Sequence, residues 1–349
     1  MWGSKFQALI IQIEAPLISM YETIIKQGVV QGNPTFLKNW DPSNFLSHKQ
    51  GKRLLEEIAR QIRSVCFNKK IDYIALTLPG TIEGTSTIEG SSRLGIFESI
   101  NVTEVCRKLD LPPTYVFHDA ECCAIGELNL YLSKNSVAET NYNTFVYIIV
   151  DEGVGSSIFI NGHPYNGAGV AGHLGRLVLQ PYGIFNPTFK SRGTLEAFAA
   201  RPWISQSVVN EYLAEKGKRG SLKASSNPFR AAVEAAASSG KVSQLTLDIL
   251  AEGVKLEDPL LLTVLEEAAQ NLGIAINAII TIMNPPLIML GGGMITNIPG
   301  FSKKVIDYAR RNAFAGSWNE TTIHIANAGK ESQILGTAHF LSKTIAKIS

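Results

Sequence analysis

Cysteine is scarce in this chain. The four cysteines, Cys66, Cys106, Cys122 and Cys123, all lie in the first 123 of its 349 residues. They show neither the paired spacing of a zinc site nor the framework of a small secreted domain held by disulfides. We therefore expect reduced thiols.

Long apolar runs are also missing. The longest, residues 272–283, is too short to span a bilayer and contains Asn277. Near the N-terminus, Gln12 and Glu14 interrupt a short apolar stretch and no small-residue cleavage site follows, which argues against a signal peptide. The expectation is a soluble cytoplasmic protein with no membrane contact.

A strong excess of one charge is lacking as well. The chain has 32 Lys and Arg against 30 Asp and Glu, a net charge of +2. No field results that would attract nucleic acid, so we expect no direct nucleic-acid binding. The length and the 45% of hydrophobic residues suit two lobes of about 100 to 200 residues each.

Extended and helical patterns alternate along the chain. In one predicted helix, Leu54, Ile58 and Ile62 share a face at helical spacing. Strands separated by helices predict an α/β protein with parallel pairing in the centre of its sheet. The predicted strands are 8–13, 71–78 and 114–117, the helices 49–67, 102–109, 120–132 and 258–283, and the polar loops 39–47 and 215–228.

The stretch 148–176 carries the strongest local signals. An apolar strand leads into Gly153-Val154-Gly155, and Asn161-Gly162 is a hairpin turn signal. Later, the apolar strand 287–290 runs into three glycines, residues 291–293. Glycine there lets a ligand or backbone approach closely, next to a helix N-terminus. A tight turn between strand and helix is the alternative.

Four segments together resemble the ROK family of sugar kinases and repressors: residues 75–80, 118–127, 153–176 and 284–293. The second is similar to the family's Asn-Asp-Ala and Gly-Glu pattern, and the fourth to its Gly-Gly-Gly after an apolar strand. The resemblance implies the actin-like ATPase (ribonuclease-H-like) fold, an α/β fold of two lobes with mixed sheets and flanking helices. It also implies a homodimer. We expect the lobes at 1–119, completed by 325–349, and at 120–324.

The resemblance assigns roles to two residues and marks a change at a third. Asp119 matches the aspartate that acts as general base toward the sugar hydroxyl in the family's kinases, and capping of the following helix is the alternative. His118 replaces the usual asparagine. Glu196 matches a family sugar ligand, although a glutamate that begins a helix also interacts favourably with the helix dipole.

Both phosphate loops depart from the family. Residues 11–17 stand where the family has Asp-Ile-Gly-Gly-Thr, and there Glu14 brings negative charge while Pro16 removes a donor. The second loop keeps Gly153 and Gly155 but has Asp151-Glu152 in place of Gly-Thr. A magnesium ion beside these acids is one interpretation, and two solvated turn residues are the other. Gly153 and Gly155, with Gly291, Gly292 and Gly293, are nonetheless the candidate nucleotide contacts.

The zinc and sugar motifs are altered too. ROK proteins often have a histidine followed by a cysteine cluster, but here Arg176 stands for that histidine and no cysteine follows, so we expect no metal ion. His173-Leu-Gly-Arg176 replaces the family's Glu-x-Gly-His. With Arg93 and His118, these residues predict a basic ligand pocket. The alternative is that Arg93 and Arg176 pair with internal acids such as Asp119 or Glu196.

The predicted function follows from these departures. We expect a ROK protein that has lost ATP-dependent phosphoryl transfer, needs no cofactor, and binds a sugar or sugar derivative, neutral or anionic, in a sensing, regulatory or other non-kinase role. The alternative is a carbohydrate kinase that uses ATP and magnesium with Asp119 as its base. A repressor role is weak, because the first predicted strand begins close to the N-terminus and leaves no room for the helix-turn-helix of family repressors.

Overall fold

The computed structural model describes residues 5–14, 17–47, 50–91, 93–135, 142–219, 227–326 and 329–348. It divides into two compact units. The first comprises Met1–Val137, Gly167–Val170 and Ala328–Ser349, and the second Ala138–Asn166 and Ala171–Asn327. By their contacts, residues 120–135 group with the first unit, and the lobe boundary at residue 119 stays a prediction.

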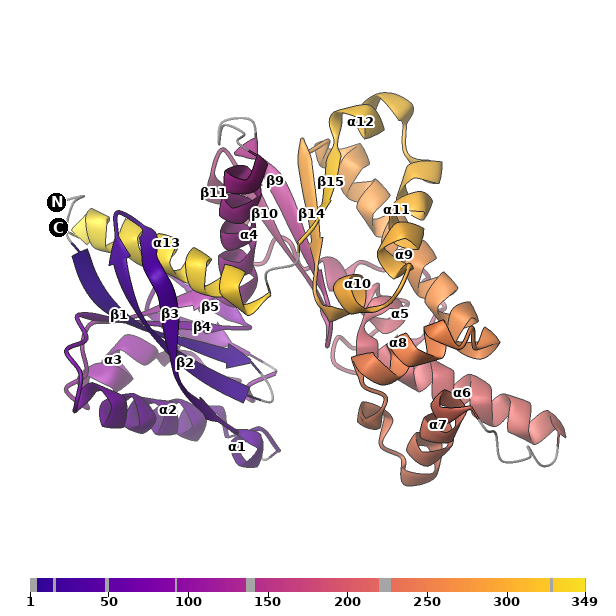
Figure 1. Ribbon diagram of the computed structural model, residues 1–349, viewed down its shortest axis with the longest axis horizontal. Coiled ribbons are helices and arrows are strands. Elements are labelled where there is room, and N and C mark those ends of the chain that lie inside the picture. The colour runs from indigo at the N-terminus through magenta and orange to yellow at the C-terminus, as the bar shows by residue number, and fades with distance from the viewer. Residues whose placement is uncertain are drawn as a thin grey trace. The chain divides into compact units, whose positions relative to one another are not determined.

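The first unit is built on a five-stranded mixed sheet in the order β3-β2-β1-β4-β8 (Figure 1). The first three strands of the chain pair antiparallel, while β1, β4 and β8 run parallel. Residues 8–11 and 13 of β1 are apolar and buried on both faces, because helices cover both sides of the sheet. The strands are β1 (Lys5–Glu14), β2 (Leu17–Lys26), β3 (Val29–Trp40), β4 (Tyr73–Leu78) and β8 (Thr114–His118).

The second unit repeats this sheet. Its order is β11-β10-β9-β14-β15, again with an antiparallel set followed by parallel strands. The predicted hairpin turn is confirmed, since Asn161 and Gly162 both have positive φ, 53° and 77°. Because the two sheets have matching strand orders, the connections that correspond to the phosphate loops, β1 to β2 and β9 to β10, occupy equivalent places in their sheets. The strands are β9 (Phe145–Val150), β10 (Val154–Ile160), β11 (His163–Pro164), β14 (Leu287–Gly291) and β15 (Thr322–Ile325).

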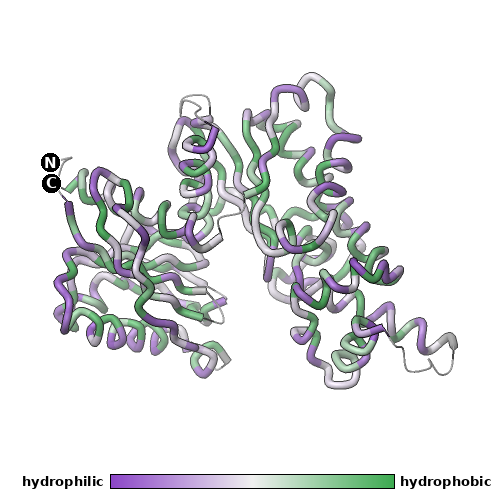
Figure 2. Tube along the Cα trace, in the orientation of Figure 1, coloured by the Kyte–Doolittle hydropathy of each residue, from purple (hydrophilic) through white to green (hydrophobic). Residues whose placement is uncertain are grey.

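Helix α2 carries much of the first unit's core. Leu54, Ile58 and Ile62 lie on its buried face, and Figure 2 shows hydrophobic and hydrophilic residues alternating along it. Residues 39–40 end β3 and residues 43–47 form a short helix, so the predicted loop 39–47 is wrong over both stretches. The remaining elements of this unit are α1 (Ser43–Ser47), α2 (Gly51–Cys66), β5 (Thr81–Glu83), β6 (Thr87–Gly90), β7 (Ile100–Asn101), α3 (Val102–Arg107), α4 (Asp119–Asn135) and α13 (Lys330–Ile348).

Helices α4 and α13 approach each other closely because each has a glycine at the contact. A methyl group on Gly126 would lie 1.8 Å from the carbonyl oxygen of Ser332, and one on Gly336 would lie 1.8 Å from that of Cys122. Only hydrogen fits at these positions. Gly126 of the 118–127 motif thus serves helix packing.

Helix α6 is longer than the sequence indicates. It runs to Arg219, so residues 215–219 of the predicted loop 215–228 are helical, while residues 220–226 lie outside the described ranges. The other elements of the second unit are η2 (Leu174–Arg176), β12 (Phe185–Asn186), β13 (Ser191–Arg192), α5 (Glu196–Ala199), α6 (Arg201–Arg219), α7 (Pro228–Ser239), η3 (Val242–Gln244), α8 (Leu247–Lys255), α9 (Pro259–Met283), α10 (Gly293–Asn297), α11 (Phe301–Asn312) and α12 (Ala315–Glu320).

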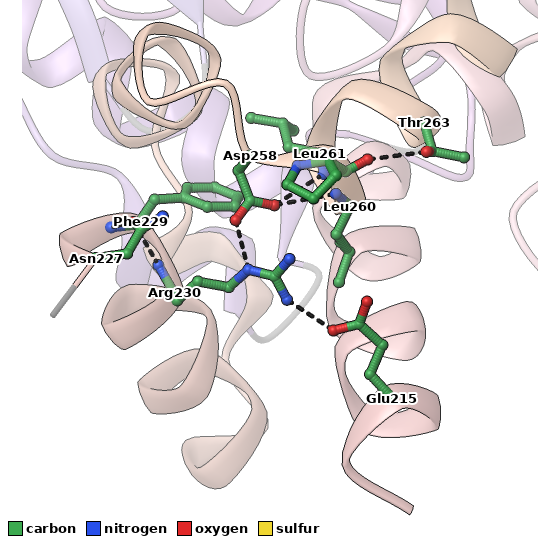
Figure 3. Close-up of polar contacts among 9 residues, drawn as sticks. Glu215, Asn227, Phe229, Arg230, Asp258, Leu260, Leu261 and Thr263 are labelled. Carbon is green, nitrogen blue, oxygen red and sulfur yellow. Dashed lines mark hydrogen bonds and ion pairs between the residues drawn. The ribbon is translucent and has the colours of Figure 1, made fainter. Parts of the chain in front are cut away.

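One buried carboxylate ties three of these helices together (Figure 3). Asp258 caps α9 by accepting the N–H groups of Leu260 and Leu261, at 3.1 and 3.3 Å. Its second oxygen accepts a hydrogen bond from Arg230 of α7, which also pairs with Glu215 of α6 at 2.9 Å. None of the helices that the structure describes combines the length and hydropathy needed to cross a bilayer.

Candidate functional site

The turn between β9 and β10 is closed by the protein's own groups. The Asp151 N–H donates to the carbonyl oxygen of Gly153 at 2.9 Å, which makes the turn tight. The Asp151 side chain accepts a hydrogen bond from the N–H of Gly293 at 3.0 Å. An aspartate carboxylate therefore uses a backbone donor of the kind that binds phosphate at a helix N-terminus.

The three glycines at the end of β14 are explained by close packing, two of them against β9 and the third against α8. A methyl group on Gly292 would lie 2.4 Å from the carbonyl oxygen of Val150, and one on Gly291 would lie 2.7 Å from the hydroxyl of Tyr147. A methyl group on Gly293 would meet Leu247 at 2.3 Å. The tight-turn interpretation accounts for these glycines without a ligand.

The second acid of the turn, Glu152, forms an ion pair with Arg201 at the start of α6. Only 12% of the Arg201 side chain is exposed, and it also donates to the carbonyl oxygen of Leu245 at 3.2 Å. Burial lowers the pKa of Arg201, while the charge of Asp151 acts in the opposite direction. Asp151 therefore serves as a hydrogen-bond acceptor and Glu152 as an ion-pair partner.

A surface pocket of about 370 Å³ lies beside this turn, within the second unit. Its lining has three carboxylates and one arginine, so its charge opposes a nucleotide's phosphates. The lining residues are Asp151, Glu152, Arg201, Ser243, Thr246, Leu247, Asp248 and Asn297. Sequence analysis missed Arg201, and the only available signal was a basic residue that follows shortly after the Gly-Thr-Leu-Glu196 segment.

The altered sugar loop and Glu196 lie together in the second unit. Gly175 must be glycine, since a methyl group there would lie 2.4 Å from the carbonyl oxygen of Val154 and 3.3 Å from a carboxylate oxygen of Glu196. That carboxylate accepts the N–H of Val154 at 3.2 Å. Exposed Arg176 stacks over the ring of Phe189, 4.3 Å from its centroid. His173, also exposed, precedes the short helix η2.

The remaining predicted site residues belong to the first unit. Asp119 begins α4 and accepts the N–H of Ala120 at 2.7 Å, and its carboxylate lies 3.5 Å from Nδ1 of His118. About a quarter of each of these two side chains is exposed. Arg93 is exposed on the turn that follows Ser91. His118 and Asp119 are therefore neighbours, and their roles toward a ligand stay predictions.

Two motif regions bear on the expected metal and phosphate chemistry. Within the described ranges, no three His, Cys, Asp or Glu side chains lie close enough together to bind a metal ion. In the first phosphate-loop region, β1 and β2 pair up to Glu14 and Leu17, so two residues connect the strands. Those two, Ala15 and Pro16, lie outside the described residues.

Comparison with known proteins decides the family. The ROK family model matches residues 48–344. The chain belongs to the ROK family. A glucokinase from Thermotoga maritima is 22% identical over 298 residues, which are 84% of this chain and 86% of the relative.

Solved ROK structures share the fold. A glucokinase from Streptomyces griseus in complex with glucose and AMPPNP has a TM-score of 0.70 at 16% identity, covering 96% of this chain and 98% of that one. A ROK transcriptional regulator homologous to the E. coli MLC protein also has a TM-score of 0.70, at 19% identity over 97% of this chain and 78% of its own. The predicted two-lobed actin-like fold is confirmed.

Proposed function

We propose that this ROK-family protein binds a sugar or sugar derivative in a sensing or regulatory role and does not transfer phosphate from ATP. The hydrogen bond from Gly293 to Asp151 carries the proposal. A phosphate that approached this helix N-terminus would have to displace a carboxylate and then stay beside it. Two unit charges of the same sign about 4 Å apart repel by about 4 kcal/mol near a protein surface.

A second observation supports the same conclusion. Glu152 is fixed by its ion pair with Arg201, so that arginine is not free to neutralise a phosphate. Phosphoryl transfer depends on positioning the phosphate groups and neutralising their charge. The turn between β9 and β10 instead supplies carboxylates, which repel phosphate. The ROK family contains both sugar kinases and transcriptional regulators. A regulator needs to bind a sugar without transferring phosphate, and this turn is compatible with that role.

The ligand class is part of the proposal. His173 and Arg176 lie on either side of Gly175 in the sequence, and Gly175 lies close to the carboxylate of Glu196 at the start of α5, so side chains that donate to oxygens and a carboxylate come from adjoining segments. A carboxylate accepts hydrogen bonds from sugar hydroxyls, while arginine and histidine donate to oxygens, more strongly when the oxygens are charged. We therefore propose a sugar or an anionic sugar derivative. The homodimer stays a prediction from the family.

Thermal shift and turnover together test this function. A panel of sugars, sugar acids and sugar phosphates should contain members that raise the melting temperature, whereas ATP with magnesium should not. A ligand at 100 times its Kd adds about 2.7 kcal/mol to the free energy of unfolding, which such a scan detects.

The kinase alternative has its own diagnostic variant. Production of ADP that depends on a sugar and disappears in Asp119→Asn would overturn the proposal, because Asp119 is the expected base. Asp110→Asn is the matched control, since Asp110 is a carboxylate of the same unit outside every matched motif.

A further inference from the structure

The loop that follows η2 exposes an unusual amount of apolar surface. Five large apolar side chains within residues 177–185 are each more than a third exposed, and Tyr182 is 97% exposed. We call these five side chains the loop surface. They are Leu177, Val178, Tyr182, Ile184 and Phe185. Apolar side chains gathered in this way on a soluble protein often mark an interaction site.

Hydrogen bonds hold this loop in one shape. The N–H of Leu179 donates to the carbonyl oxygen of Gly193 at 2.9 Å, and the N–H of Gly193 donates to that of Ile184 at 2.8 Å. The Gln180 side chain donates to Asn271 of α9 at 3.2 Å. Gly193 has a φ of 62°, and a methyl group there would lie 1.5 Å from the carbonyl oxygen of Gln180. A partner would therefore meet a preorganised surface and lose little entropy in ordering it.

The loop surface is framed by positive charge. Residues 153–195 contain no Asp or Glu, while Arg176, Lys190 and Arg192 are exposed. Arg176 stacks over Phe189, and Arg192 lies 5.6 Å from the ring centroid of Phe185. Stacking fixes the plane of a guanidinium and leaves N–H groups at its edge to donate to a carboxylate.

We propose that the loop surface docks a protein segment in which carboxylates flank apolar side chains. Charge complementarity selects this partner. A second copy of the chain is disfavoured, because a two-fold axis through the surface would bring the three cations toward their own images. Single-stranded nucleic acid is the alternative that the experiment distinguishes, because exposed Tyr182 offers an aromatic face on which a base could stack. The proposal does not depend on the ligand of the sugar loop.

Peptide display on the full chain tests this interaction. A random-peptide library is selected on the wild type and counterselected on a Tyr182→Ser/Arg192→Gln double variant. Enriched peptides should combine Asp or Glu with large apolar residues. Their synthetic forms should bind in fluorescence anisotropy, about tenfold more weakly to either single variant and more weakly as salt rises.

Phe314→Ser is the matched control, because Phe314 is 76% exposed in the same unit but outside the loop. It should bind the peptides as the wild type does, and circular dichroism of all variants checks their folding. Enrichment of neutral or basic peptides, or equal binding to the double variant, overturns the proposal. So does self-association in sedimentation that Tyr182→Ser abolishes, or binding of a thymidine oligonucleotide that the same variant loses.

Discussion

The side chain of Asp151 accepts a hydrogen bond from the backbone N–H of Gly293, 142 residues further along the chain. This bond joins the turn after β9 to the first residue of α10. In Asp151→Ala the backbone N–H of Gly293 would donate to water instead, because Gly293 is only partly buried. We expect a loss of about 0.5–1.5 kcal/mol in the free energy of unfolding.

Asp151→Asn is the control, since an amide oxygen still accepts the bond without the charge. Urea unfolding compares the two variants. Equal losses in both would show that the negative charge, rather than the hydrogen bond, stabilises the turn. Neither variant should gain an ATP-induced thermal shift, because Glu152 and the acidic pocket remain.

Gly126 is expected to tolerate no side chain. In Gly126→Ala the new methyl group would collide with the backbone of Ser332, and backbone in a packed helix pair cannot move aside cheaply. We expect a loss of about 3 kcal/mol or more. Gly217→Ala is the matched control, because Gly217 lies in α6 with open space around it and should gain about 0.5–1 kcal/mol. Similar effects of the two substitutions in urea unfolding would contradict the packing role of Gly126.

The large-scale fold could be predicted because its signals are local. Strand 8–13, the periodic helix at 49–67 and Asn161-Gly162 each specify their own element, and repetition of the pattern gives two similar sheets. Motif residues could be placed on elements for the same reason. The contacts of Asp151 and Glu152 could not, because Gly293 and Arg201 are distant in sequence and no local pattern links them.

The errors in secondary structure have similar causes. Residues 215–219 read as a loop because Glu-Lys-Gly-Lys-Arg is polar and contains glycine. In the structure, Glu215 pairs with Arg230 and Lys216 with Glu234 of α7. These tertiary contacts stabilise the helical conformation at the end of α6. The helix at 43–47 is a single short turn, too brief to show a period.

Asp258 should be among the most sensitive positions of the second unit. Its side chain is 2% exposed and both of its oxygens accept hydrogen bonds. Asp258→Ala removes the cap of α9 and leaves the partly buried Arg230 with one partner, at an expected cost of about 3–5 kcal/mol. Thr246→Ala, which removes only the single cap bond of α8, should cost about 0.5–2 kcal/mol. Chemical denaturation that ranks Thr246→Ala as the more damaging change would contradict this network.

His339 of α13 should make the first unit sensitive to acid. Burial lowers its pKa to about 4, and the charge of Lys343 acts in the same direction. In the unfolded chain the histidine pKa is about 6.5, so His339 becomes protonated there as the pH falls toward 4, while in the folded state it stays neutral. The free energy of unfolding should therefore decrease across this window, by about 3 kcal/mol at most, and level off below pH 4.

His339→Gln isolates this effect, because the carboxylates that also titrate are common to both proteins. Urea unfolding at a series of pH values gives the stability of each. The wild type should lose more stability than the variant between pH 6.5 and 4. A difference between the two that stays constant across that range would mean that His339 does not carry the titration.

Arg176→Gln separates a ligand contact from a structural one. Because Arg176 is exposed and stacks on Phe189, its loss should cost only about 0.5–1 kcal/mol of stability.

If Arg176 contacts the ligand, the variant should lose affinity for an anionic sugar derivative and keep its affinity for the neutral parent. A charge-assisted hydrogen bond contributes about 1.5–3 kcal/mol, which corresponds to at least a tenfold weaker Kd. Arg192→Gln is the matched control, since it also removes an arginine that stacks on a phenylalanine, but one outside the His173-Leu-Gly-Arg176 motif. Calorimetric titration of both variants decides the matter: an unchanged preference for the anion in Arg176→Gln, or a large loss of stability, removes Arg176 from the sugar site.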